Sequence, residues 1–298
     1  MSPESTLVFE GDYAVRKRGF AHLLRMEVEA IYYIKTHIPT HIPVPTIIGF
    51  CLDEQAKTIA RVEENYIRMK KVAGQRLDAA WPTMSPASRA RTCQQLRTYL
   101  EQLHGLEPEP GTSQVRAISG GACYNHRKSE PPSRAPSLTL TSAAEFRRPF
   151  LWRPHADVAR FQASLPNHLQ ARRPEAAERL RRRFVAAAGP GTGMGAAAAG
   201  DQQQQPPRRR ACFAHGDLSW ANIFVDEATG DVTGITDWET AGFWPEWWEY
   251  YMALLGPRGE QSWWRQVVVS IMSEYPVEVA IMADIESMTA EIAREEAG

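Results

Sequence analysis

Cysteine is scarce in this sequence: only four occur among 298 residues, and no two of them form a C-x-x-C pair. Cysteines that lie this far apart exclude a small scaffold held together by disulfides, and they argue against a structural zinc site. We therefore expect the four thiols to be reduced.

Long apolar runs and an excess of one charge are also missing. No stretch approaches the ~18 apolar residues of a transmembrane helix, and the N-terminal MSPESTLVFEGD is acidic where a secretory signal would have a basic start. The 34 lysines and arginines nearly balance the 35 aspartates and glutamates, so no basic field favours nucleic acid or a membrane surface. The sequence predicts a cytoplasmic protein that acts on a small molecule, with neither nucleic acid nor a membrane as a partner.

The first seventy residues predict a small α+β unit. Residues 7–17 fit a hairpin around a Glu-Gly-Asp turn, and residues 20–37 carry apolar side chains at steps of three and four, which predicts a helix. Residues 46–52 and 66–69 have the composition of strands. Strands on both sides of one long helix indicate an α+β arrangement rather than regular βαβ winding.

The rest of the chain is mainly helical in pattern. The clearest helix spans residues 85–105, because a serine and a proline mark its start and a glycine marks its end. Residues 107–142 are expected to be mostly irregular, and residues 186–210 to form a low-complexity insertion with too little apolar material to fold. We expect an N-terminal lobe at residues 1–70 and a larger lobe at residues 71–298.

The polar side chains that point to chemistry gather in residues 212–239. An apolar strand, a polar loop and two short apolar strands follow one another there. Asp217, Asn222 and Asp237 fall at neighbouring strand ends, where their oxygen atoms can converge on one cation. Phosphoryl transfer needs such a set: one carboxylate orients the attacking hydroxyl, while an amide and a second carboxylate hold Mg²⁺ against the nucleotide phosphates.

The motif H-G-D-x-x-x-x-N from His215, followed by I-x-D-W-E from Ile235, resembles the catalytic core of the aminoglycoside phosphotransferase family, especially its fungal branch. The resemblance implies a two-lobed, protein-kinase-like fold with a small sheet-plus-helix N-lobe and a mainly helical C-lobe. It also implies that ATP and Mg²⁺ are the cofactors and that a hydroxyl of a small molecule is the acceptor. By this resemblance Asp217 is the catalytic base, Asn222 and Asp237 are the magnesium ligands, and His215 supports the loop.

The resemblance continues on both sides of this core. The strand around Lys17 is similar to the strand that bears the family's phosphate-contacting lysine, and Glu27 lies on the helix whose acid pairs with that lysine. A stretch similar to the family's hinge between lobes makes Met69 and Lys71 candidates for nucleotide binding. Residues 120–127 also resemble a signature of the fungal branch.

Three residues after Asp237 are candidates for the acceptor side of the site: Glu239, Trp244 and Glu249. Acidic side chains suit a cationic acceptor such as an amino sugar, but they could equally cap helices. A tryptophan could equally pack in the core. His215 has a second interpretation too, as a general base.

A glycine-rich phosphate loop is missing ahead of Lys17. Only sixteen residues precede this lysine, enough for one of the two strands that cover the phosphates in the family. We therefore expect a truncated N-terminal lobe. The alternative function is a catalytically weak or inactive nucleotide-binding relative of the same fold. A protein kinase is a lower alternative, because the chain has neither D-F-G nor A-P-E.

Overall fold

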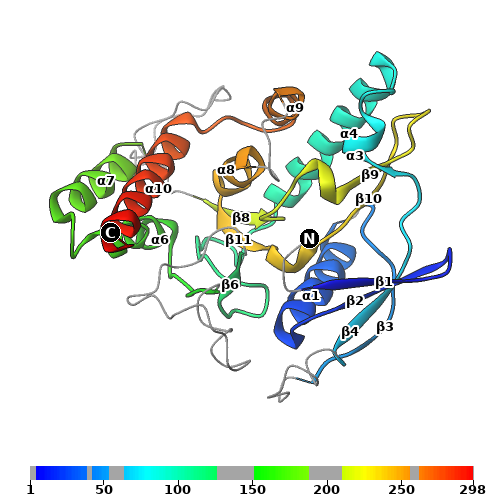
Figure 1. Ribbon diagram of the computed structural model, residues 1–298, viewed down its shortest axis with the longest axis horizontal. Helices are drawn as coiled ribbons and strands as arrows, with labels where there is room; N and C mark the ends of the chain where they lie inside the picture. The colour runs from blue at the N-terminus through cyan, green and yellow to red at the C-terminus, as the bar shows by residue number, and fades with distance from the viewer. Residues whose placement is uncertain are drawn as a thin grey trace.

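The computed structural model describes residues 5–38, 42–53, 64–125, 151–187, 210–255 and 262–297. The first part of the chain forms a four-stranded antiparallel sheet with the strand order β1-β2-β4-β3 (Figure 1). Its strands are β1 (Thr6–Glu10), β2 (Ala14–Arg18), β3 (Ile47–Cys51) and β4 (Tyr66–Lys70). The expected hairpin and both expected strands are confirmed. Among the described residues, β1 is the sole strand ahead of β2.

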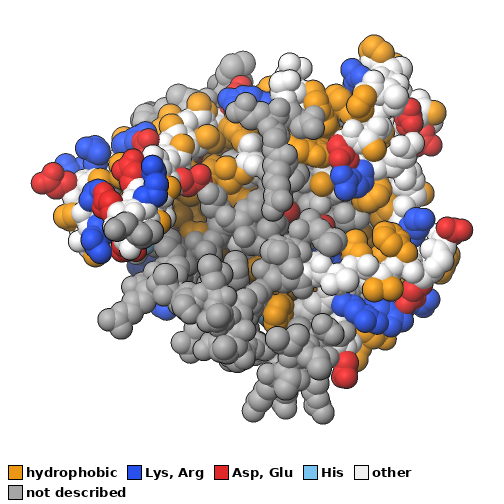
Figure 2. Space-filling view, viewed as in Figure 1, with side chains coloured by type: hydrophobic (Ala, Val, Ile, Leu, Met, Phe, Trp, Pro, Cys, Tyr) orange, Lys and Arg blue, Asp and Glu red, His pale blue; other side chains and the backbone are white. Residues whose placement is uncertain are grey.

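The two faces of this sheet differ in chemistry. On the outer face Glu10 forms ion pairs with Arg16 at 2.6 Å and with Arg68 at 2.5 Å. Figure 2 shows Lys and Arg side chains gathered over the sheet. The opposite, inner face carries side chains that alternate with these. The strand register places six of them there: Leu7, Phe9, Val15, Lys17, Ile67 and Met69.

Helix α1 (Ala21–His37) covers part of the inner face. Its buried apolar residues recur at steps of three and four, which gives the helix one apolar side. The helix ends at His37, and its C-cap residue Ile38, which directly precedes Pro39, is extended, as is favoured before a proline. Besides the sheet, α1 packs against η3 (Trp238–Thr240), a 3₁₀ turn of the larger lobe. The helix therefore joins the two lobes.

Helix α4 (Pro86–His104) opens the helical part and agrees with the helix expected at 85–105. The Ser85 side chain accepts a hydrogen bond from the Ser88 backbone N–H at 3.1 Å, which caps the helix start. Leu96, Leu100 and Leu103 are buried along one side. The N-cap and the apolar spacing explain why this helix was predictable.

Short strands and further helices complete the larger lobe. A three-stranded antiparallel sheet, β10-β9-β5, and a two-stranded one, β11-β8, hold the strands on either side of the polar loop, and helices flank them (Figure 1). The strands are β5 (Gln75–Arg76), β6 (Cys123–Tyr124), β7 (Leu151–Trp152), β8 (Ala211–Ala214), β9 (Ile223–Val225), β10 (Val232–Ile235) and β11 (Gly242–Pro245). The helices are α3 (Leu77–Ala80), α6 (Val158–Ser164), α7 (Pro174–Ala187), α8 (Trp248–Leu255), α9 (Ser262–Ile271) and α10 (Pro276–Ala297), with the 3₁₀ turns η1 (Asn167–Leu169) and η2 (Trp220–Asn222).

Two expectations concern residues only partly covered by the structure. The stretch 107–142 was expected to be mostly irregular; its described part contains the two-residue strand β6, and residues 126–142 lie outside the described ranges. The predicted insertion at 186–210 overlaps the end of α7 by two residues, and residues 188–209 also lie outside those ranges. The lobe boundary at residue 70 stays a prediction. None of the helices in the described part of the chain is long and apolar enough to cross a membrane.

Candidate active site

The loop at residues 215–222, here called the Asp217 loop, connects β8 to β9 and ends with the 3₁₀ turn η2. Gly216 begins its turn with φ +77°, and a Cβ on this residue would lie 2.6 Å from the Thr240 carbonyl oxygen. Only glycine therefore fits at this position. The Gly216 N–H donates to Glu249 Oε2 at 3.1 Å, and the Gly216 carbonyl accepts from Asn125 Nδ2 at 2.8 Å. Side chains from two other elements thus hold the peptide groups just ahead of Asp217.

Asp217 and Asn222 face each other across the loop. Asn222 Nδ2 donates to the Asp217 carbonyl at 2.9 Å and to Asp217 Oδ2 at 3.3 Å. Both side chains are buried. Because the amide nitrogen of Asn222 points to Asp217, the amide oxygen is directed away from it. The loop therefore brings together two of the three residues predicted from sequence.

Asp237 follows β10 and has an unusual backbone. Its φ and ψ are 64° and 53°, and it is the one non-glycine residue with positive φ in the described chain. Such strain persists where the surroundings impose it, often at functional sites. The Thr236 N–H donates to the Asn222 carbonyl at 2.9 Å. The third predicted residue is thus joined through the backbone to the other two.

His215 links the loop to the segment before Asp237. Its Nδ1 accepts from the Asp217 N–H at 3.2 Å, and its Nε2 lies 2.9 Å from the Thr236 carbonyl. A carbonyl oxygen only accepts, so Nε2 carries the proton and Nδ1 does not. Both ring nitrogens are engaged with backbone, and the side chain is buried. These backbone contacts favour the interpretation of His215 as a loop support over that as a general base, and the role stays a prediction.

Lys17 lies at the centre of a buried charge cluster. Its Nζ is 2.7 Å from Glu27 Oε2, 2.9 Å from Asp237 Oδ1 and 2.7 Å from Glu239 Oε2. The Lys17 side chain is fully buried, while that of Asp237 is 17% exposed. The expected Lys17 and Glu27 pair is therefore formed in the structure. Asp237 and Glu239 join it from the larger lobe.

The charge cluster shifts the pKa values of its members. Burial disfavours the Lys17 ammonium, but the charges of Asp237, Glu239 and Glu27 outweigh burial and raise the pKa of Lys17 well above its usual value. Burial, aided by the neighbouring carboxylates, raises the pKa of Glu27 to about 7 against the attraction of Lys17. For Asp237, burial is outweighed by Lys17, which lowers the pKa of that carboxyl to about 2. Lys17 and Asp237 are thus both charged at neutral pH.

The residues present suit a magnesium ion. Asn222 and Asp237 offer an amide oxygen and a carboxylate, the hard donors that Mg²⁺ prefers. Lys17 faces more than one carboxylate, and this excess of negative charge favours a divalent cation. Within the described ranges, no three His, Cys, Asp or Glu side chains are arranged to hold a metal by themselves. A bound ion would therefore complete its shell with phosphate oxygens and water.

The two hinge candidates lie at the end of β4. Met69 is buried and pairs with Val15 in the sheet. The Lys71 N–H donates to the Tyr13 carbonyl at 2.8 Å, so the sheet already satisfies this backbone donor. A role for Met69 and Lys71 in nucleotide binding stays a prediction.

The three acceptor-side candidates, Glu239, Trp244 and Glu249, are buried and already have partners within the protein. Glu239 is buried against Lys17, and Glu249 lies beneath the Asp217 loop, where it accepts from the N–H groups of Gly216 and Leu218. Burial raises the pKa of Glu249 to about 7, although the backbone donors counteract it. Trp244 is fully buried, with its ring stacked 4.6 Å from that of Trp248. All three side chains are buried, and a role for them as acceptor contacts stays a prediction.

Sequence reasoning missed two contacts of the loop. Asn125 bonds the Gly216 carbonyl, and the Thr240 hydroxyl donates to the His215 carbonyl at 2.7 Å. Asn125 falls inside the stretch 120–127 that resembles a family signature, which was the only available signal. No periodic pattern marks a side chain that reaches across 91 positions.

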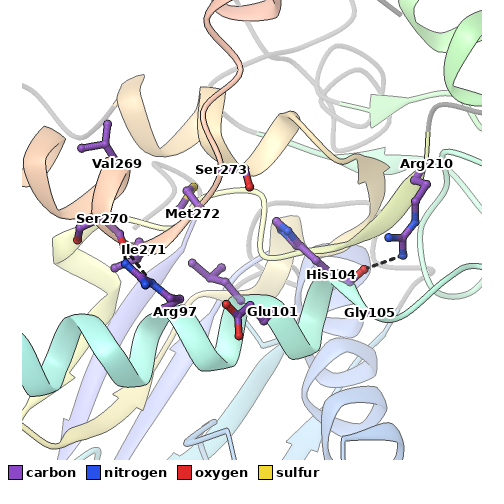
Figure 3. A pocket seen from close by; sticks show the side chains of 11 residues that line it. Arg97, Glu101, His104, Gly105, Arg210, Val269, Ser270, Ile271, Met272 and Ser273 are labelled. Atoms are coloured by element: carbon purple, nitrogen blue, oxygen red, sulfur yellow. Dashed lines mark hydrogen bonds between the residues drawn. The ribbon is translucent and has the colours of Figure 1, made fainter. Parts of the chain in front are cut away.

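A separate groove lies between the ends of α4 and α9 and is lined by Arg97, His104, Arg210 and Ser270, among others (Figure 3). Its cavity volume is about 500 Å³. Arg97 Nε donates to the Ser270 carbonyl at 3.0 Å and Arg210 to the His104 carbonyl at 3.3 Å, so both guanidinium groups satisfy helix-end carbonyls. No candidate site residue lines this groove.

Comparison with known proteins relates this geometry to a family. The sequence matches the model of the phosphotransferase enzyme family over residues 10–270. The chain belongs to the phosphotransferase enzyme family. A search of curated proteins finds no match.

Solved structures agree with this family in fold. The GDP complex of wild-type aminoglycoside 2'-phosphotransferase-IIIa is similar with a TM-score of 0.55 and 14% identity, over 97% of this chain and 82% of that chain. The GDP and kanamycin complex of APH(2")-IIia is similar with a TM-score of 0.55 and 14% identity, over 100% of this chain and 86% of that one. The expected protein-kinase-like fold is thereby confirmed for this phosphotransferase-family chain.

Proposed function

We propose that this chain transfers the γ-phosphoryl group of ATP, with Mg²⁺, to a hydroxyl of a small molecule. The observation that carries the proposal is the convergence of two lobes on one charge cluster. Lys17 of the small lobe contacts Asp237, and Asp237 follows the residue that bonds Asn222 beside Asp217. Magnesium-bound ATP supplies the phosphoryl group and the divalent charge that offsets its oxygens.

Each residue then has a role that its position supports. Asp217 accepts a hydrogen bond from the acceptor hydroxyl, orients its oxygen for attack and takes its proton. Asn222 and Asp237 hold the metal. Lys17, held by Glu27, contacts phosphate oxygens. His215 and Glu249 keep the Asp217 loop in place through backbone bonds.

The inner face of the small-lobe sheet suits a nucleobase. Phe9, Val15 and Met69 lie opposite one another on neighbouring strands, just beyond Lys17 in the same face. Phe9 is 63% exposed although it belongs to this apolar row. A flat base would cover it, because aromatic rings stack favourably on one another.

Nucleotide binding is the first test. We expect isothermal titration calorimetry with magnesium-bound ATP to show binding, and the Asp237→Asn variant to lose the dependence on magnesium, since a carboxylate ligand is replaced by an amide. GTP belongs in the same titration, because two similar structures carry GDP. A wild-type protein that binds neither nucleotide at millimolar concentration would contradict the proposal.

Transfer is the second test. A panel of hydroxyl-bearing metabolites and aminoglycosides, kanamycin among them, is incubated with magnesium-bound ATP, and phosphorylated product is detected by mass spectrometry. The similar kanamycin complex is the reason to include aminoglycosides. We expect one chemical class in the panel to gain 80 Da per molecule, the mass of a phosphoryl group; phosphorylation of proteins and of no small molecule would instead favour a protein kinase.

A nucleotide-binding protein without efficient transfer is the second candidate. The observation that favours it is the engagement of Lys17 by three carboxylates, because phosphate oxygens must displace at least one of them. Binding in the calorimeter together with no product from any acceptor would select this candidate.

A further inference from the structure

The segment at residues 115–125, here called the bridging segment, lies between the two lobes and precedes residues outside the described ranges. It joins β11 through two backbone bonds between Arg116 and Phe243, at 3.1 and 2.9 Å. Its β6 pairs with β7. In Figure 1 this segment lies beside α1 and next to β11. It therefore belongs to the larger lobe by its hydrogen bonds, and it borders the small lobe.

One end of the bridging segment packs on α1. Tyr124 and Ala117 form a buried cluster with Leu23 and Met26 of that helix. Tyr124 is 1% exposed. Met26 directly precedes Glu27, the residue that holds Lys17. A shift of Tyr124 is thus transmitted to the helix turn that positions the Lys17 and Glu27 pair, because close-packed interiors leave little room for independent movement.

The next residue of the segment bonds the Asp217 loop. Asn125 is fully buried, and its Nδ2 donates to the Gly216 carbonyl at 2.8 Å. The N–H of the same residue, Gly216, is bound by Glu249 Oε2 at 3.1 Å. The bond from Asn125 therefore fixes the orientation of the peptide that precedes Asp217.

We propose that the bridging segment is an interlobe clamp and that Asn125 is a positioning residue for Asp217. Two consecutive residues, Tyr124 and Asn125, contact the small-lobe helix and the loop of the larger lobe respectively. They couple the position of the Lys17 and Glu27 pair to that of Asp217. The catalytic part of this inference rests on the proposed function; the coupling of α1 to the loop does not.

The first test measures the coupling without any substrate. Hydrogen exchange followed by mass spectrometry compares the wild type with Asn125→Ala and Tyr124→Leu. We expect Asn125→Ala to speed exchange in peptides that cover residues 214–219, and Tyr124→Leu to speed it both there and in α1. If Asn125→Ala does not fold, Asn125→Asp replaces it. This change keeps the size of the side chain but places an acceptor against the Gly216 carbonyl, so we again expect faster exchange at residues 214–219.

Gln95→Ala is the matched control. Gln95 is also an amide that binds backbone, since its Oε1 accepts from the Val232 N–H at 2.7 Å, but it lies away from the Asp217 loop. We expect this variant to leave exchange at residues 214–219 and in α1 unchanged. Unchanged exchange at the loop in Asn125→Ala and Asn125→Asp, or equal acceleration in Gln95→Ala, would overturn the clamp.

The second test measures catalysis with the acceptor identified in the panel. We expect Asn125→Ala to lower kcat by about 10- to 100-fold, because small displacements of a reacting group have effects of this size, while KM for ATP changes less than about threefold. A loss confined to KM would overturn the positioning role. If the wild type itself transfers no phosphoryl group, the proposed function fails, and the exchange measurements still decide the clamp.

Discussion

At the scale of single residues, the most demanding feature is the burial of Lys17 among acids. Burying charges is unfavourable unless each is paired, and replacing a buried ion cluster with apolar groups is often neutral or stabilising. Lys17, Glu27 and Glu239 are all at most 2% exposed. Stability alone gives little reason to keep this cluster, whereas a site that receives phosphate oxygens and a divalent ion needs these charges.

Removing the Lys17 ammonium should leave its acidic partners buried without an opposite charge. We predict that Lys17→Ala lowers the free energy of unfolding by about 3–5 kcal/mol, because the acids lose their only buried partner of opposite charge in the cluster. Urea denaturation followed by circular dichroism measures the change. A change below about 1 kcal/mol would show that the acids are solvated or protonated at little cost.

Glu239→Gln provides the matched control for this prediction. The double variant Lys17→Ala, Glu239→Gln removes one of the acids left unpaired, so it should be more stable than Lys17→Ala alone. In the wild-type background the same Glu239→Gln change removes an attractive contact at 2.7 Å and should be destabilising. The opposite signs in the two backgrounds are the signature of direct coupling.

The sequence was informative about some of these residues and not about others. Asp217, Asn222 and Asp237 lie within one stretch of strands and loop, where spacing and residue type limit the geometry. The contact between Lys17 and Asp237 spans 220 positions, so only a family resemblance pointed to Lys17. The contacts of Glu249 with the Gly216 and Leu218 N–H groups were not predictable, because an acid near a site can face either solvent or the backbone beneath a loop.

At the scale of elements, predictability followed the strength of local signals. α1 and α4 have periodic apolar faces, and α4 also has an N-cap, so their bounds were predicted within one or two residues. β5, β6 and β7 have two residues each. A strand this short shows no alternation, and backbone partners far along the chain decide that it forms.

The Asp217 loop depends on glycine for its shape. We predict that Gly216→Ala lowers the free energy of unfolding by about 2–5 kcal/mol, because the new Cβ meets both a left-handed backbone and the Thr240 carbonyl at 2.6 Å. Thermal or urea unfolding measures the loss.

Gly11→Ala is the control that measures the cost of a left-handed backbone without a steric clash. Gly11 also has positive φ, at +64°, but a Cβ there would meet nothing within 4 Å. Its replacement should cost only about 1–2 kcal/mol. Equal losses of unfolding free energy in the two variants would mean that the contact with the Thr240 carbonyl does not contribute to the loss.

At the scale of the whole molecule, a continuous core joins the lobes. One hydrophobic cluster includes residues of α1, β4, α4, β8 and α9. The small lobe is therefore packed against the larger lobe, and the chain segment after β4 is not its sole connection. The two-lobed fold came from the resemblance of the motifs rather than from composition, because composition and periodicity gave only an α+β pattern.

Charged side chains from both lobes form one buried cluster around Lys17. The small lobe provides Lys17 and Glu27, and the larger lobe provides Asp237, Glu239 and the Asp217 loop. This division explains why no single segment of sequence specifies the whole site. It also explains why the motif in residues 215–239 was the strongest signal, since that half of the site is local.

The most direct measurement of the central claim is the rate of phosphoryl transfer by Asp217→Asn under single-turnover conditions, with its affinity for magnesium-bound ATP measured alongside. Asparagine keeps the size of the side chain and an oxygen that can accept from Asn222, but it cannot take a proton. We predict a rate lower by about 10²- to 10⁴-fold and a nucleotide Kd within about threefold of the wild-type value. Equal rates for the wild type and Asp217→Asn would contradict the account.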